Sequence, residues 1–348
     1  MGDLPYHTAM TEIDPRYIIA GQLRRDFAIF PDGRALLDVL GGHLPYAAVG
    51  LAIWEPDTRP GLVARVGEDY PSEWLAALEA RGFDVRGVHI LPEALDLRSF
   101  YVYPDRSTRN SDDPVAQCAR LGIPVPRILL GYRPSQPAFD SRTRLTPTSL
   151  RQADLPEDYL DASAAHLCPV DFLTHSLLPA VLRQHGFTTV TLDPSTGTMT
   201  PNNWDDMPAL VIGLTAFLPA EQELRALFHG RSTDLWEMME ALAGYGCELI
   251  VVKRGERGQL LYDAASHAKY ELTAYPARVA DPTGAGDAFC GGFLAGYRQT
   301  YDPVQAVLHG SVSASLVVEG SGPFYALDAL PGLAQARLAA MQEAIRKI

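Results

Sequence analysis

The chain has 348 residues and 47% of them are hydrophobic, which is enough apolar material for a large core. Its 29 Lys and Arg residues stand against 42 Asp and Glu residues, giving a net charge of −13 with no basic run. This balance argues against nucleic acid and anionic membranes as main partners.

The cysteines and the apolar stretches indicate the cellular compartment. Cys118, Cys168, Cys247 and Cys290 are scattered and form no Cys-x-x-Cys pair. We expect reduced, buried thiols, not a disulfide framework or a zinc site. No apolar stretch approaches about 18 residues and the N-terminus lacks a signal-peptide pattern, so a soluble, cytoplasmic protein is predicted.

The first third of the chain is rich in strand patterns. The predicted strands are residues 17–21, 22–30, 62–67 and 100–103, and the predicted helices are residues 45–53 and 73–81. The segment 110–148 is rich in Pro, Arg and Ser. It is interpreted either as an insertion beside a lid or as a loop wrapped over the core.

Beyond residue 164, predicted strands and helices alternate. The strands are residues 165–168, 188–192, 248–253 and 259–263, with one more inside 209–218, and the helices are residues 171–185, 219–228 and 235–245. This alternation predicts a parallel sheet with helices on both faces.

The most informative motif is the run Asp-Pro-Thr-Gly-Ala-Gly-Asp-Ala-Phe at residues 281–289. Its small residues allow backbone N–H groups to approach a ligand, and the apolar segment after it is predicted to be a buried helix. A loop at a helix N-terminus favours an anion. A carboxylate there, Asp287, suits proton removal from a hydroxyl that attacks a phosphoryl group.

This run resembles the C-terminal motif of the ribokinase-like (PfkB) carbohydrate kinases, Asp-Thr-x-Gly-Ala-Gly-Asp, with Pro282 in place of the usual Thr. The resemblance implies an ATP-dependent kinase that transfers the γ-phosphate to a hydroxyl of a sugar, nucleoside or polyol. It makes Gly284, Ala285 and Gly286 the anion hole and Asp287 the general base, and it extends over roughly residues 17–323.

The resemblance also implies an architecture. We expect one α/β domain over residues 1–348, with a doubly wound, mainly parallel central sheet flanked by helices. A small β lid would take strands from about 17–45 and 95–110, followed by the insertion at about 110–148. Relatives often bury such lids in a homodimer, which is therefore an expectation for this chain.

Substrate-side elements are found in the N-terminal half. The resemblance makes Asp26 the acceptor of substrate hydroxyl hydrogen bonds and gives Gly41 and Gly42 close backbone approach to the ligand. Tyr46 stands where the family usually has Asn, and it is either a ring contact or a core aromatic. Arg109 either reaches a phosphate or carboxylate or lies on the solvated surface.

The nucleotide-side motifs match the family pattern less closely than the substrate-side motifs. Glu223 matches the acidic residue of the family's Asn-x-x-Glu, which acts on Mg²⁺ through water, but Ala220 replaces the Asn. Glu223 is otherwise an ordinary acid of a helix N-terminus. Lys253 replaces a Thr and brings a cation near the phosphates, unless it is a solvated strand end.

Glycines and one acid complete the expected nucleotide site. The resemblance implies that Gly255 and Gly258 shape the turn under the nucleotide, and that the loop at Gly320 and the segment around Asp281 close the adenine pocket. Many relatives hold a monovalent cation in that region. The sequence indicates the loop but not the cation.

Two other interpretations stay open. A kinase-fold protein that binds a metabolite or nucleotide with little or no catalysis is favoured by Ala220 and Tyr46, which remove two expected polar contacts. The intact Gly-Ala-Gly-Asp argues against it. A nicotinamide or flavin enzyme is disfavoured, because the motif lacks the third glycine and the downstream acid of a dinucleotide fingerprint.

Overall fold

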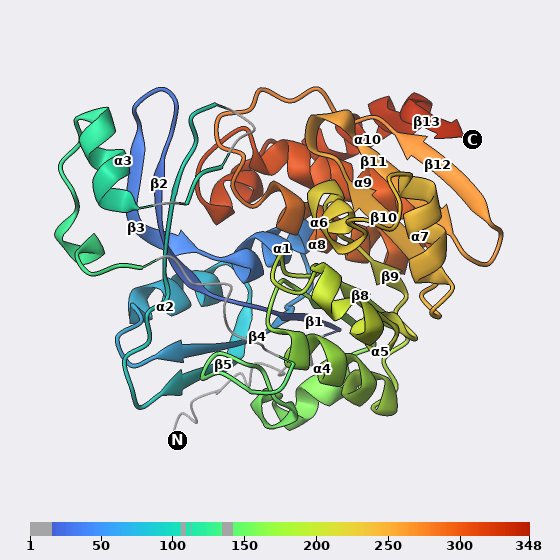
Figure 1. Ribbon diagram of the computed structural model, residues 1–348, viewed down its shortest axis with the longest axis horizontal. Coiled ribbons are helices and arrows are strands. Elements are labelled where there is room, and N and C mark those ends of the chain that lie inside the picture. Colours follow the sequence, from blue (N-terminus) through green and yellow to red (C-terminus); the bar gives the residue numbers. More distant parts are fainter. Residues whose placement is uncertain (1–15, 106–108, 112, 134–141) are drawn as a thin grey trace, which may run out of the picture.

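The computed structural model describes residues 16–105, 109–111, 113–133 and 142–348 (Figure 1). Within these ranges ten strands form one sheet in the order β13-β12-β11-β10-β9-β8-β7-β1-β4-β5. The strands from β10 to β5 in this order run parallel, and β11, β12 and β13 continue the sheet antiparallel. The predicted α/β class with a mainly parallel sheet is therefore confirmed.

The strand bounds follow the chain order. They are β1 Tyr17–Ala20, β4 Gly61–Gly67, β5 Asp84–Leu91, β7 Ala164–Leu167, β8 Thr189–Leu192, β9 Ala216–Phe217, β10 Leu249–Lys253, β11 Gln259–Asp263, β12 Ala268–Leu272 and β13 Ile345–Lys347.

The helices cover both faces of this sheet. Their bounds are α1 His43–Ala52, α2 Ser72–Ala80, α3 Pro114–Leu121, α4 Phe172–Gln184, α5 Met207–Val211, α6 Glu221–Leu227, α7 Leu235–Ala243, α8 Ala285–Thr300, α9 Pro303–Val317 and α10 Leu333–Met341.

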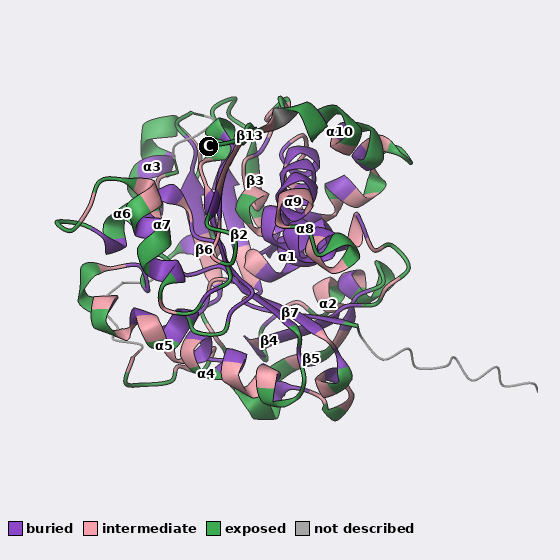
Figure 2. Ribbon diagram, turned by 90° about the vertical axis from the view of Figure 1, so that its right-hand side faces the viewer, coloured by how far each residue is buried: buried purple, intermediate pink, exposed green. Residues whose placement is uncertain are grey.

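Alternating side chains of the buried strands supply two cores. Ile19 joins the core under α1, α8 and α9, whereas its neighbour Ile18 joins the core under α4, α5 and α7. Figure 2 shows α1, α8 and α9 as an almost wholly buried group. A two-residue period with both faces covered is what a parallel sheet between helix layers requires. Among the described helices none is both long and apolar enough to cross a membrane.

A second sheet of three strands, which we call the lid, stands beside the large one. It consists of β2 Arg24–Ile29, β3 Ala35–Gly41 and β6 Arg98–Val102 in the order β3-β2-β6. Residues 17–20 belong to the large sheet, so the lid begins at Arg24 and not near residue 17. The register of β2 and β3 shifts at a bulge between Asp26 and Phe27.

In the segment 110–148 the part from α3 to Tyr132 packs on the lid, whereas Arg142 contacts Asn202 and Asp206, and residues 112 and 134–141 lie outside the described residues. Cys118 of α3 and Leu129 join Phe27, Ile29 and Phe100 in a separate apolar cluster on one lid face. The other face presents Tyr101 and Tyr103. The chain's own insertion thus covers a lid face, which is the role the dimer expectation gave to a second copy.

Several elements escaped the sequence patterns. Helix α9 is buried on nearly all sides, so its residues show no polar face and no helical period. Strand β13 pairs with β12 through only three residues. Strand β5 is an edge strand whose side chains alternate poorly between buried and exposed.

Glycines set the close crossing of α1 and α8. A Cβ at Gly291 would overlap the carbonyl oxygen of Ala47, and one at Gly50 would overlap the carbonyl oxygen of Ala288. Since both collisions are with backbone atoms, the helices can accept a larger residue only by moving apart. These contacts fix the first two turns of α8 against the middle and last turn of α1.

We predict that Gly291→Ala lowers the free energy of unfolding by about 1–3 kcal/mol or more, because the added methyl group forces the two helices apart. Urea unfolding of the purified variant measures this. Gly197→Ala is the matched control, since a Cβ there meets nothing within 4 Å. Equal stability of the two variants would contradict the packing argument.

Candidate active site

The site lies at the carboxyl edge of the large sheet. The chain adds strands outward from β1 to β4 and β5, and then from β7 to β8, β9 and β10 on the other side, so β1 and β7 flank a topological switch point. A cavity of about 250 Å³ opens there between the lid and the start of α8. Lid strands, α1 and the loop before α8 all contribute to its lining.

The loop before α8 brings the predicted motif to this cavity. Gly284 has a φ of 76°, in the left-handed region, and precedes the first residue of α8, Ala285. A Cβ on Gly284 would overlap the ring of Tyr46, so only glycine fits this turn. Thr283, Gly284 and Asp287 line the cavity, with Asp287 in the first helical turn.

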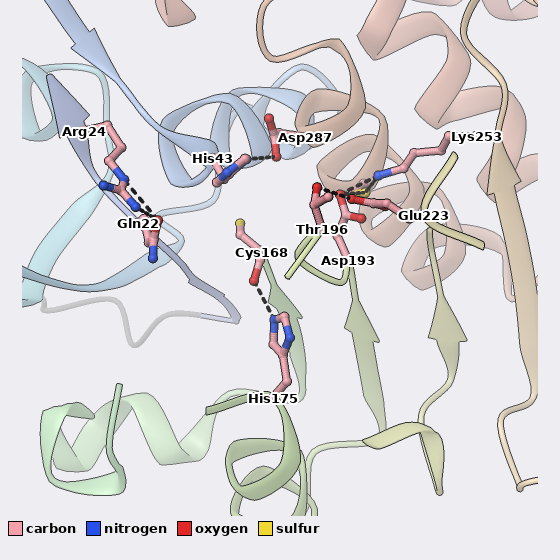
Figure 3. A network of polar contacts seen from close by, with 11 residues as sticks. Gln22, Arg24, His43, Cys168, His175, Asp193, Thr196, Glu223, Lys253 and Asp287 are labelled. Carbon is pink, nitrogen blue, oxygen red and sulfur yellow. Dashed lines mark hydrogen bonds and ion pairs between the residues drawn. The ribbon is translucent and has the colours of Figure 1, made fainter. Parts of the chain in front are cut away.

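His43 contacts the proposed base directly. Its Nδ1 lies 2.9 Å from Oδ1 of Asp287, joining the first turn of α1 to the first turn of α8 (Figure 3). Burial disfavours the charged imidazole, but Asp287 and Asp193 outweigh it and raise the pKa of His43. From the sequence alone His43 is interpreted as a surface or satisfied histidine, because its partner is 244 residues away.

The substrate-side residues meet at the lid end of the cavity. Asp26 is 5% exposed and accepts a hydrogen bond from the Tyr101 hydroxyl at 2.8 Å. Burial raises the pKa of Asp26, although Tyr101, Arg109 and the Gly42 amide partly offset this. A Cβ on Gly41 would overlap the Asp26 carboxyl, and Gly42 has a φ of 93°. Both glycines are therefore required beside this carboxylate.

Tyr46 and Arg109 also line the cavity. Tyr46 is 4% exposed and packs beneath Gly284, so it is a core aromatic whose surface also reaches the cavity. The Arg109 guanidinium lies over the Tyr101 ring, 4.4 Å from its centroid.

A buried ion pair lies behind the α8 loop. Lys253, at the end of β10, contacts Asp193, which follows β8, and its Nζ is 3.5 Å from Sγ of Cys290 (Figure 3). A Cβ on Gly286 would be 3.6 Å from the same Nζ, so the ammonium lies directly under the loop. Burial raises the pKa of Asp193, whereas Asp193 and Glu223 hold the pKa of Lys253 above its usual value. Lys253 therefore remains charged.

Glu223 caps its own helix. Its Oε2 accepts a hydrogen bond from the Ala220 N–H at 2.9 Å, and its Oε1 accepts one from the Thr196 hydroxyl at 3.2 Å. Burial raises its pKa. Among the described residues there is no group of three or more His, Cys, Asp or Glu side chains that could hold a metal ion.

The remaining nucleotide-side residues lie outside the cavity lining. Gly258 has a φ of 81° and a Cβ there would overlap the Leu272 carbonyl oxygen, while Gly255 has a φ of 59°. Asp281 is 1% exposed and accepts a hydrogen bond from the Thr283 N–H. Gly320 packs so closely on the Tyr325 ring that a Cβ would overlap it. Packing explains the glycines at 258 and 320, and the left-handed backbone explains Gly255.

The residues at the loop suit a nucleotide phosphate better than a resident metal. The small residues at 284–286 let an anion approach the first amides of α8, of which the Ala285 N–H makes only a long hydrogen bond, 3.4 Å, to the Pro282 carbonyl, and Lys253 adds a full charge beneath them. The acids nearby already have partners: Asp193 contacts Lys253, and Glu223 accepts hydrogen bonds from Ala220 and Thr196.

Comparisons with known proteins point in the same direction. The family model of the pfkB family carbohydrate kinases matches residues 146–330. The chain is 30% identical to a cytidine kinase of Thermococcus kodakarensis over 284 residues, covering 81% of this chain and 88% of that protein.

Solved structures share the fold. A putative ribokinase II from E. coli has 17% sequence identity and a TM-score of 0.66, covering 93% of this chain and 99% of the other. A Burkholderia thailandensis nucleoside kinase in complex with inosine has 17% identity and a TM-score of 0.66, covering 94% and 99%. The ribokinase-like fold is thereby confirmed.

The His43–Asp287 pair predicts a pH dependence of stability. The pKa of His43 in the folded protein is raised above its ordinary value of about 6.5. The stabilisation from the charged imidazolium is therefore fully present below about pH 6.5 and is lost as the pH rises through the pKa of the folded state. We expect His43→Asn to lower the melting temperature more at about pH 5.5 than at about pH 8.5. Differential scanning calorimetry at both pH values tests this, and an equal difference would contradict the pair.

The Lys253–Asp193 pair predicts a rescue. Lys253→Met leaves a buried carboxylate without its cation and should cost about 3–5 kcal/mol in the free energy of unfolding. Adding Asp193→Asn removes the stranded charge and should restore much of that loss. Urea unfolding of both single variants and the double variant measures the coupling. A double variant no more stable than Lys253→Met would refute it.

Proposed function

The chain belongs to the pfkB family of carbohydrate kinases and is a phosphotransferase with a hydroxyl acceptor, and we propose that it transfers the γ-phosphate of ATP to a nucleoside- or sugar-like acceptor in the cavity beside Asp287. The observation that carries this proposal is the position of Asp287 on the cavity wall, at the N-terminus of α8 and next to a glycine loop. A proton acceptor and an anion cradle are thus contiguous.

The proposed step forms one phosphorus–oxygen bond and breaks another. The acceptor oxygen attacks the γ-phosphorus while the bond from that phosphorus to the ADP oxygen breaks, so ADP leaves with the bonding electrons. The hydroxyl proton passes to a carboxylate oxygen of Asp287. Oδ1 already contacts His43, which leaves Oδ2 as the oxygen for the acceptor. His43 thereby orients the base.

Charge on the moving phosphoryl group is proposed to be stabilised by the amides at 284–286 and by Lys253. Fixed dipoles and a nearby ammonium act strongly in a site that is closed to water. Asp193 keeps Lys253 in position through the buried ion pair. Asp26, with Gly41 and Gly42, is proposed to hold the acceptor at the other end of the cavity.

Glu223 would contact, through water, a Mg²⁺ ion that accompanies ATP, and such an ion would neutralise phosphate charge. Gly255, Gly258, Asp281 and Gly320 are proposed to shape the nucleotide side. An E. coli putative ribokinase II of the same fold forms a complex with ATP and Mg²⁺, which supports this nucleotide. A relative that matches 81% of the chain is a cytidine kinase, which makes nucleosides the first acceptors to test.

We predict that Asp287→Asn folds and binds ATP but has a turnover number about 10²–10⁴-fold lower, because general-base removal typically has that effect. The assay incubates the protein with MgATP and a panel of nucleosides, sugars and polyols. It follows ADP release and identifies the phosphorylated product by mass spectrometry.

Asp234→Asn is the matched control for this change. Asp234 caps α7 through the N–H groups of Trp236 and Glu237, and Asn caps a helix equally well. The control should retain full activity. Turnover of Asp287→Asn at the wild-type rate would refute the assigned base, and ATP binding without a product from any acceptor would favour the binding-protein interpretation.

A further inference from the structure

Two guanidinium groups face the cavity without a carboxylate partner. Arg24, at the start of β2, and Arg109, after β6, both line it. In the described part of the chain neither forms an ion pair within 4.0 Å. The Nε and Nη2 atoms of Arg24 instead donate to one neutral oxygen, Oε1 of Gln22, at 3.0 and 2.6 Å (Figure 3).

Neighbouring arginines show how unusual this is for the lid. Arg25 is bonded through two nitrogens to Asp38, at 2.8 and 2.6 Å. Arg98, which also lines the cavity, is bonded through two nitrogens to Asp96, both at 2.7 Å. The lid therefore pairs two of its arginines with acids and leaves Arg24 and Arg109 at the cavity without one.

The two unpaired cations also disfavour each other. Burial lowers the pKa of Arg24, the attraction of Asp26 does not make up for it, and Arg109 lowers it further. Arg24 is half-buried and Arg109 is exposed, so the cost of an unpaired cation falls mainly on Arg24. The arrangement is thus incomplete as it stands, and a negative charge between the two groups would complete it.

Both arginines are positioned to receive a ligand. The Arg109 guanidinium lies over the Tyr101 ring, 4.4 Å from the ring centroid, and the Tyr101 hydroxyl donates to Asp26. Asp26 accepts a hydrogen bond from Tyr101 and Asp287 contacts His43. Among the described residues neither carboxylate forms an ion pair with Arg24 or Arg109 within 4.0 Å, so neither takes the place of the missing anion.

We propose that Arg24 and Arg109 bind an anionic group, a carboxylate or a phosphate, carried by the acceptor at the end away from its reacting hydroxyl. This inference rests on the proposed function and narrows it to acidic acceptors, such as a sugar acid, a sugar phosphate or a nucleoside with an acidic base. A guanidinium binds either oxyanion through two parallel hydrogen bonds.

The test uses acceptors in matched pairs that differ by one anionic group: glucuronate and glucose, ribose 5-phosphate and ribose, and orotidine and uridine. Isothermal titration calorimetry measures their binding to the wild type, Arg24→Gln, Arg24→Lys and Arg25→Gln. The pairs separate a carboxylate from a phosphate. Arg25→Gln is the matched control, with the same change one residue along β2 and outside the cavity lining.

We expect at least one anionic acceptor to bind about tenfold or more tightly than its neutral partner, the scale of a charge-assisted hydrogen bond. Arg24→Gln should abolish that preference without weakening the neutral partner. Arg24→Lys should keep part of it, and Arg25→Gln all of it. If Arg24→Gln fails to fold, the Arg24→Lys series and the wild-type pairs still decide.

Equal or weaker binding of every anionic member, absence of binding by all of them, or equal losses for both members in Arg24→Gln would overturn the inference. Measuring ADP formation in the same mixtures distinguishes a failure of this inference from a failure of the proposed kinase function. Anion binding through Arg24 without phosphorylation would uphold the site and defeat the kinase proposal. Phosphorylation of a neutral acceptor, unchanged in Arg24→Gln, would do the reverse.

Discussion

The backbone contact between α1 and α8 is the constraint on which the site depends. Gly50 and Gly291 let the two helices cross with backbone against backbone, so both helix N-termini reach the carboxyl edge of the sheet together. His43 and Asp287 meet there because each belongs to the first turn of its helix. A looser crossing would separate the proposed base from His43 and would move the anion loop away from Lys253.

Charge is distributed along the cavity in a definite order. Lys253 and its partner Asp193 lie beneath the loop that begins α8, the His43–Asp287 pair lies at the cavity wall, and Asp26 lies at the lid. Beyond Asp26 the lid offers two arginines without acids of their own. In a chain of net charge −13, anionic ligands must be bound by such local groups, because the overall field repels them. The phosphate donor and an acidic acceptor would then approach from opposite ends.

Local motifs were readable from the sequence where the residue types leave few alternatives. The Gly-Ala-Gly-Asp run predicted a loop before a buried helix, and α8 begins at Ala285. Contacts across the fold were not readable. The partner of Asp287 is 244 residues away, and Asp193, which contacts Lys253, lies 60 residues before it. Helix α9 was missed because it is buried on nearly all sides and so has no polar face, and Glu223 is found to cap α6.

The central claim is that the acceptor hydroxyl and the terminal phosphate meet between Asp287 and the loop at residues 284–286. A crystal structure of Asp287→Asn with a non-hydrolysable ATP analogue and an acceptor found in the product screen tests it most directly. The account predicts the terminal phosphate on the loop amides and the acceptor hydroxyl about 3 Å from residue 287, a hydrogen-bonding distance. A phosphate bound elsewhere, or an acceptor whose hydroxyls all point away from residue 287, would contradict it.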